Sequence, residues 1–209
     1  LGALPEAGTG PQDQLNLEAA LQRTFMNVRE RLGDGRVLFV TDLSRNPDTA
    51  ELIRRWTENF GVNGRQVFRL KCAPYTARET TVFPSVSRRQ PVDHELICIE
   101  KYGAKGWFFA NNEQVLAPAE LGLLQNDLKA LGAAYDIVLI ERDTPLISGG
   151  DTMFEQLCRL ADYTVVTAVF NEDRKIQLRQ LGANEALSNG HIGGILTSVG
   201  KKFWSIQQS

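Results

Sequence analysis

The sequence has no apolar run long enough to cross a membrane and very few cysteines. No stretch approaches the about 18 to 20 apolar residues of a membrane-spanning helix, and none resembles a secretory signal peptide. Any membrane link is therefore expected outside this chain. The three cysteines, Cys72, Cys98 and Cys158, are widely spaced and form no CxxC pair. Their number and spacing predict reduced, buried thiols in a cytosol, without disulfides or metal ligation.

The chain also lacks an excess of either charge. Lysine and arginine number 23 against 25 aspartates and glutamates, which gives a net charge of −2 over 209 residues. No strong field therefore attracts nucleic acid or an anionic membrane surface, and we expect binding to neither. The two histidines, His94 and His191, lie far apart without cysteines or carboxylates at ligand spacing. The catalytic signatures GxSxG, HExxH and GxGxxG are absent as well.

What the sequence does contain is a regular alternation of short apolar runs and amphipathic segments. Hydrophobic residues make up 43% of the chain, enough for one sizeable core. The apolar runs predict strands at residues 36–41, 66–70, 95–100, 107–110, 135–141, 163–170 and 193–199. Helical periodicity predicts helices at residues 15–32, 49–61, 117–131, 151–160 and 173–188.

This alternation predicts a doubly wound α/β fold. Strands that are apolar on both faces indicate a mostly parallel sheet with helices on both faces. The runs at 36–40, 135–140 and 163–169 are the most continuously apolar, so we place them in or near the centre of the sheet. Ligands of such folds bind beyond the carboxyl ends of the strands.

Two segments fall outside the alternation. Residues 1–14 are rich in Gly, Pro and Gln and are interpreted as a flexible linker before a single domain at 15–209. Residues 73–93 contain three prolines and are interpreted as a long surface loop. Because the chain starts at Leu1 without an initiator methionine, we expect it to be a piece of a longer protein.

Several stretches resemble one protein family. GGILTSVG and AAYDIVLIERDTPLISGGDTMFEQLCRLADYTVVTAVF are similar to strand motifs of the C-terminal tyrosine-kinase-like domain of bacterial polysaccharide copolymerases, of the MinD/ParA P-loop type. LGALPEA resembles the stretch after the last membrane helix of those proteins, and residues 15–32 take the place of the helix before the first strand. The resemblance implies a P-loop NTPase-like fold on the cytoplasmic side of the bacterial inner membrane, in a complex that makes exopolysaccharide or capsule.

The phosphate loop departs from this pattern. A working loop needs glycines whose backbone N–H groups wrap the phosphates, a Lys that reaches them, and a Ser or Thr for Mg²⁺. When Thr41 is aligned with the family's threonine, Asn46 and Asp48 stand at glycine positions, Thr49 at the lysine and Ala50 at the Mg²⁺-binding hydroxyl. The degenerate loop positions are Asp42, Ser44, Arg45, Asn46, Asp48 and Thr49. We therefore expect no nucleotide, cofactor or metal here.

The same residues suit a role inside the fold. Asn46 can cap the following helix, Pro47 fits its first position, and the Asp48 carboxylate suits the positive end of the helix dipole. Asp42 and Asp48 would repel a phosphate, with Arg45 as the only nearby cation in the sequence.

The second acidic motif of the family is also altered. In YDIVLIERDTP the family's aspartate is replaced by Glu141 or displaced to Asp143. Either carboxylate can hold water or a metal, or can cap the next turn. The strand that starts at Gln66 ends in Leu-Lys-Cys, without the aspartate of the kinases. The tyrosine cluster of their tail is absent from KKFWSIQQS, and Glu18 lacks the arginines of their oligomerising helix.

These departures favour a regulatory or scaffolding domain over a kinase. The expected partners are other subunits of a polysaccharide synthesis and export complex, with a homo-oligomer possible. Arg78, Arg88 and Arg89 in the long loop are the candidate partner-binding residues, because arginine pairs well with carboxylate and phosphate groups. The alternatives are an active ATP-dependent tyrosine autokinase with an atypical loop and a soluble MinD-like regulator.

Overall fold

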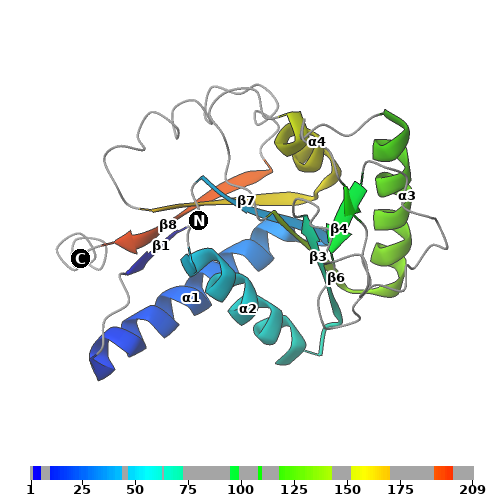
Figure 1. Ribbon diagram of the computed structural model, residues 1–209. Coiled ribbons are helices and arrows are strands. Elements are labelled where there is room, and N and C mark those ends of the chain that lie inside the picture. Colours follow the sequence, from blue (N-terminus) through cyan, green and yellow to red (C-terminus); the bar gives the residue numbers. More distant parts are fainter. Residues whose placement is uncertain are drawn as a thin grey trace.

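A mainly parallel sheet forms the centre of the molecule (Figure 1). The computed structural model describes residues 2–5, 10–43, 47–62, 64–72, 95–98, 108–109, 118–142, 152–169 and 191–199. The strands are β1 (Gly2–Pro5), β2 (Val37–Asp42), β3 (Val67–Cys72), β4 (Glu95–Cys98), β5 (Phe108–Phe109), β6 (Ile137–Arg142), β7 (Tyr163–Val169) and β8 (Ile192–Val199). The helices are α1 (Pro11–Leu32), α2 (Pro47–Val62), α3 (Pro118–Ala134) and α4 (Thr152–Leu160).

The sheet has the predicted parallel centre. Within the described residues the strands lie in the order β1-β8-β7-β2-β6-β3-β4-β5. The first six strands in this order, β1 through β3, pair in parallel with their neighbours. The last two are antiparallel, because β4 runs opposite to β3 and β5 runs opposite to β4. The three strands predicted to be central, β7, β2 and β6, are adjacent, and every residue of β2 and β6 is buried. The doubly wound α/β prediction is confirmed.

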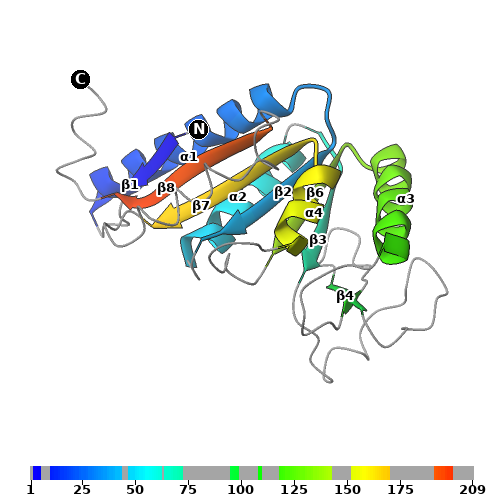
Figure 2. The same ribbon diagram turned by 90° about the horizontal axis from the view of Figure 1, so that it is seen from above.

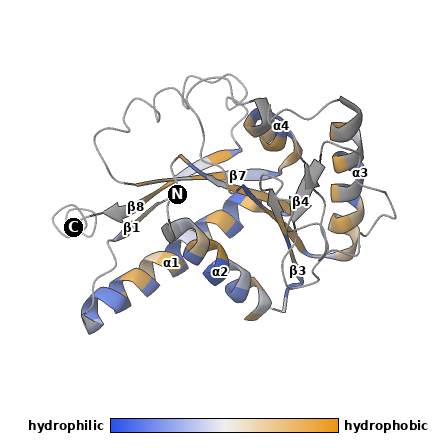
Figure 3. Ribbon diagram, viewed as in Figure 1, coloured by the Kyte–Doolittle hydropathy of each residue, from blue (hydrophilic) through white to orange (hydrophobic). Residues whose placement is uncertain are grey.

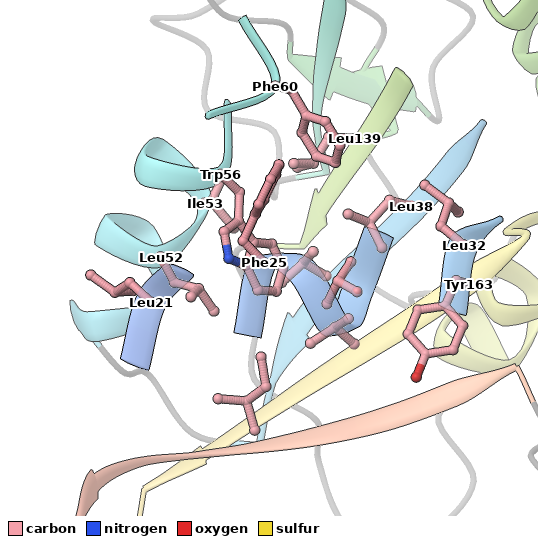
Figure 4. Close-up of a cluster of buried hydrophobic side chains, with 14 of the residues drawn as sticks. Leu21, Phe25, Leu32, Leu38, Leu52, Ile53, Trp56, Phe60, Leu139 and Tyr163 are labelled. Atoms are coloured by element: carbon pink, nitrogen blue, oxygen red, sulfur yellow. The ribbon is translucent and has the colours of Figure 1, made fainter. Parts of the chain in front are cut away.

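Helices cover both faces of the sheet (Figure 2). On one face α1 and α2 pack against Leu38 and Val40 of β2 and their neighbours; on the other, α3 and α4 pack against Val37 and Phe39. Apolar and polar residues are interspersed along α1 (Figure 3), so the helix buries one stripe and exposes the rest. Between α1 and α2, Trp56 and the edge-to-face pair of Phe25 and Phe60 fill the core (Figure 4).

The linker predicted for residues 1–14 differs from the structure. Gly2–Pro5 forms the edge strand β1, which pairs in parallel with β8, and α1 begins already at Pro11. The reason is tertiary, because Ala3 and Leu4 are buried in the core beside α1 and their backbone completes the edge of β8. A Gly- and Pro-rich composition alone does not reveal such a docked strand.

Other expectations cannot be compared with the structure. The loop predicted at 73–93 and the helix predicted at 173–188 lie outside the described residues. Among the described helices, none combines the length and the apolar character that a membrane span requires. Of the three cysteine side chains only that of Cys158 is described, and it is partly buried.

Two aspartates hold the amino-terminal ends of β2 and β3. The Asp162 carboxylate accepts hydrogen bonds from the backbone N–H groups of Arg36 at 2.7 Å and Val37 at 2.8 Å. Asp136 does the same for Gln66 at 2.9 Å. Gly35 permits the close approach, because a Cβ atom there would lie 2.6 Å from the Cβ of Asp162. These contacts align β2 with the turn that leads into β7.

We predict that D162A destabilises the protein more than D136A does. The first substitution leaves two backbone N–H groups without their charged acceptor and the second leaves one. Each hydrogen bond to a carboxylate contributes about 1.5 to 3 kcal/mol. The free energy of unfolding, measured by urea titration, should fall by about 3 to 6 kcal/mol for D162A and by roughly half of that for D136A. Equal losses in the two variants would contradict this account.

A charged network joins α1 to α2 at the surface. Glu51 accepts hydrogen bonds from Arg54 at 2.7 Å and from Arg55 at 2.9 Å, and Arg55 also pairs with Glu18 of α1 at 2.9 Å. Arg54 further pairs with Glu58. The hydrogen bond from Arg54, followed by that from Arg55, holds the pKa of Glu51 down at about 2, from its ordinary 4.5.

We predict that this network makes a small, acid-sensitive contribution to stability. Because the pKa of Glu51 is lower in the folded than in the unfolded chain, its contribution is complete above about pH 4.5 and is lost as the pH falls towards 2. Because Glu51 and its arginine partners are exposed to solvent, the loss in the free energy of unfolding should stay below about 1 kcal/mol. Urea unfolding should therefore show E51Q less stable than the wild type at pH 5.5, with the gap closing near pH 2.5. E30Q, at an exposed glutamate of α1, serves as control, and a constant gap would refute the assignment.

Candidate functional site

The candidate site lies at the carboxyl ends of β2, β6 and β7. β2 leads directly into α2, while β6 and β7 lie on either side of β2 in the sheet. In open α/β sheets this is the edge at which ligands bind. The topology therefore brings together the segment after β2 that the family resemblance aligns with the phosphate loop and Glu141 at the end of β6.

The beginning of α2 follows the sequence prediction. The helix starts at Pro47, whose fixed φ suits the first helical position. Ser44, Arg45 and Asn46 lie outside the described residues, as does the side chain of Asp48, so their roles in capping and charge stay predictions.

Thr49 is the best-defined residue of the segment that the resemblance aligns with the phosphate loop. Its side chain is 6% exposed, and its hydroxyl lies 2.7 Å from the hydroxyl of Thr167 on β7. Thr167 in turn donates to the backbone oxygen of Thr41 at 3.4 Å. The residue that the family resemblance aligns with the phosphate-binding lysine is therefore short, uncharged and hydrogen-bonded inside the fold.

Asp42 ends β2 close to this threonine cluster. It is 8% exposed and, by the alternation of the strand, follows Leu38 and Val40 on the face covered by α1 and α2. The next residue, Leu43, donates its N–H to the backbone oxygen of Thr167 at 2.9 Å, which ties the end of β2 to β7. A buried carboxylate at this edge opposes the approach of a phosphate.

Glu141 forms an ion pair across two strands. Its Oε2 atom lies 2.8 Å from Nη2 of Arg69 on β3, with the two side chains 11% and 18% exposed. Both residues belong to the face covered by α1 and α2, since they alternate with Val67, Ile137 and Leu139 of that core. Of the two carboxylates left open by the sequence, Glu141 is thus engaged with Arg69, and Asp143 lies outside the described residues.

Sequence reasoning missed Arg69. The signal was a cation in the middle of the strand Val67–Cys72, on the same face as Lys71 two residues later, at a position that a doubly covered parallel sheet buries. A buried guanidinium needs a carboxylate partner, and Glu141 on the neighbouring strand was the matching acidic residue. The pairing itself required knowledge that β3 and β6 are neighbours.

The structure also shows the residues of α1 that replace the arginines expected from the family's oligomerising helix. These residues, Leu21 and Thr24, lie on the buried face of α1. Glu18 is exposed and pairs with Arg55 of α2.

The cavities of the described structure lie away from this edge. Cavities of about 590 Å³ beside Val67 and Tyr135, and of about 630 Å³ beside Arg36 and Val37, lie at the opposite, amino-terminal ends of the strands. In the described part of the chain, no three His, Cys, Asp or Glu side chains come close enough to hold a metal ion.

Comparison with known proteins gives matches among solved structures alone. No model of a protein family matches the chain, and a search of curated proteins finds no significant relative. The kinase domain of the Escherichia coli tyrosine kinase ETK superposes with a TM-score of 0.61 at 13% identity, over 96% of this chain and 90% of that one. The VpsO kinase domain superposes with a TM-score of 0.55 at 17% identity, over 90% and 98%.

The tyrosine kinase domain of BceF superposes with a TM-score of 0.51 at 18% identity, over 90% of this chain and 77% of that one. At such identities, superposition establishes the fold and leaves the chemistry to be argued from the site. The chain has the fold of bacterial tyrosine kinase domains.

Proposed function

We propose that this domain is a non-catalytic regulatory or scaffolding part of a bacterial inner-membrane complex that makes and exports exopolysaccharide or capsule. The single observation that supports the loss of catalysis most directly is Thr49. It stands at the lysine position, carries no charge, and binds Thr167 within the fold. At the lysine position, a phosphate would meet this uncharged hydroxyl.

Electrostatics around the site supports the same proposal. Transferring a phosphoryl group needs cations that offset the charge of the phosphates and of the transition state. Here the ends of β2 and β6 carry two buried carboxylates, Asp42 and Glu141, beside the buried Arg142, and Arg69 pairs with Glu141. The domain therefore acts through contacts with partners, and it sits on the cytoplasmic side of the membrane.

We predict that the domain does not bind ATP and Mg²⁺ with useful affinity. Isothermal titration calorimetry should give a dissociation constant weaker than about 1 mM, which corresponds to less than about 4 kcal/mol of binding free energy. A working tyrosine kinase domain of the same fold, titrated under the same conditions, serves as positive control. Micromolar binding, or transfer of phosphate to tyrosine in the purified domain, would sink the proposal and favour the autokinase alternative.

The partner surface is proposed from sequence. Arg78, Arg88 and Arg89 lie outside the described residues, so the support for them is the length of their segment and the chemistry of arginine. Such side chains suit the acidic or phosphorylated segment of another subunit in the complex. A homo-oligomer would use the same kind of contact between copies.

We predict that R88A/R89A lowers polysaccharide output or changes chain length in cells while leaving the domain folded. Exposed substitutions usually alter the free energy of unfolding within about 0.5 kcal/mol, so loss of function would report lost contacts. R23A/R29A, at two exposed arginines of α1, is the matched control. Unchanged polymer in R88A/R89A, together with lost polymer after deletion of the domain, would place the working surface elsewhere.

A further inference from the structure

We infer that the cavity at the carboxyl end of α2 is a binding site for a small aromatic molecule that carries one carboxylate or a similar anionic group. The cavity has a volume of about 590 Å³ and lies between the end of α2, the start of β3 and Tyr135. Small-molecule sites in proteins have volumes of about 300 to 1,000 Å³. Because the cavity lies at the amino-terminal edge of the sheet, the inference does not depend on the proposed function.

The motif that ends α2 fixes the backbone of this cavity. Gly64 has a φ of 73°, and its N–H donates to the backbone oxygen of Gly61 at 2.9 Å. The N–H of Arg65 donates to the backbone oxygen of Phe60 at 3.1 Å, which completes the two bonds of a Schellman motif. An apolar residue that packs back on the helix commonly follows the glycine of this motif. Here that position is Arg65, which lines the cavity.

The wall of the cavity is mainly apolar. Val62 is 87% exposed and Val67 only 6%, so the apolar lining runs from the surface towards the core. Tyr135 also lines the cavity, and its ring packs on that of Phe68 with the centroids 4.9 Å apart. Apolar side chains on a concave surface favour an apolar ligand, because binding removes both surfaces from water. The ring of Tyr135 favours an aromatic one.

Two side chains of the lining offer unused hydrogen-bond donors. In the part of the chain that the structure describes, the side chain of Arg65 makes no ion pair and the hydroxyl of Tyr135 makes no hydrogen bond. The carboxylate of the lining, Glu58, is paired with Arg54. Asp136, beside the cavity, uses its Oδ2 atom to accept a backbone N–H. An aromatic molecule with an anionic group therefore complements both the apolar wall and the free guanidinium.

The test is a fluorescence titration of the whole chain with anilinonaphthalene sulfonate, an aromatic anion. The wild type should bind this probe with a dissociation constant below about 100 µM. G61L should weaken the binding at least about tenfold. A Cβ atom at Gly61 meets no other atom within 4 Å, so a leucine there extends into the cavity without a clash. G122L is the matched control, because Gly122 is an exposed glycine of α3 with equally open space and does not line the cavity.

A second comparison assigns the anionic group to Arg65. R65M should weaken binding of the sulfonate at least about fivefold and leave binding of phenylnaphthylamine, an uncharged analogue, unchanged. Methionine keeps an unbranched stem without the charge. R23M removes an exposed arginine of α1 and should change neither titration. Urea unfolding verifies that each variant is folded, and G61M replaces G61L if the latter is not.

Three results would overturn the inference. They are a wild type that binds no sulfonate up to about 1 mM, a folded G61L that binds it as tightly as G122L, and an R65M variant whose affinities for the two probes change alike or not at all. None of them bears on the proposed function. Conversely, ATP binding by the wild type contradicts the proposed function, whatever the cavity binds.

Discussion

Burial of both faces of the central strands is the constraint on which the rest of the structure depends. β2 and β6 are buried along their whole lengths, including Thr41, Asp42 and Glu141 at their carboxyl ends. Polar groups in such a place need internal partners, because water reaches them poorly. The hydroxyl pair of Thr49 and Thr167 and the ion pair of Arg69 and Glu141 supply such partners at the edge where this fold usually binds ligands.

The two internal pairs differ in what they contribute. The hydroxyl pair joins the first turn of α2 to β7, and so fixes the helix on the strand next to its own. The ion pair joins β3 to β6 and places two charges in a largely buried position. Buried ion pairs rarely stabilise a protein more than well-packed apolar residues would.

A chain can share the fold of bacterial tyrosine kinase domains without sharing their phosphate-binding residues. The backbone follows that of three bacterial tyrosine kinase domains over nine-tenths or more of the chain, at 13 to 18% identity. A sheet with covered faces depends on apolar periodicity, which many sequences satisfy. Phosphate binding depends on a few exact residue types, so it can be lost while the fold is kept.

The sequence by itself determined the parts of the protein that depend on local pattern. Continuous apolar runs identified β2, β6 and β7 as central, because only strands covered on both faces lack polar alternation. Pro47 predicted where α2 begins, since proline fits the first helical position. The absence of glycine and lysine from residues 41–50 was equally visible, because it can be read position by position.

Only the tertiary structure decided the features that join distant segments. Gly2–Pro5 became a strand because β8, about 190 residues later, offers it an edge. β4 runs antiparallel to β3, although an apolar run has no direction of its own. Arg69 and Glu141 are separated by 72 residues and meet because β6 inserts between β2 and β3. Such pairings depend on strand order, which periodicity along the chain does not encode.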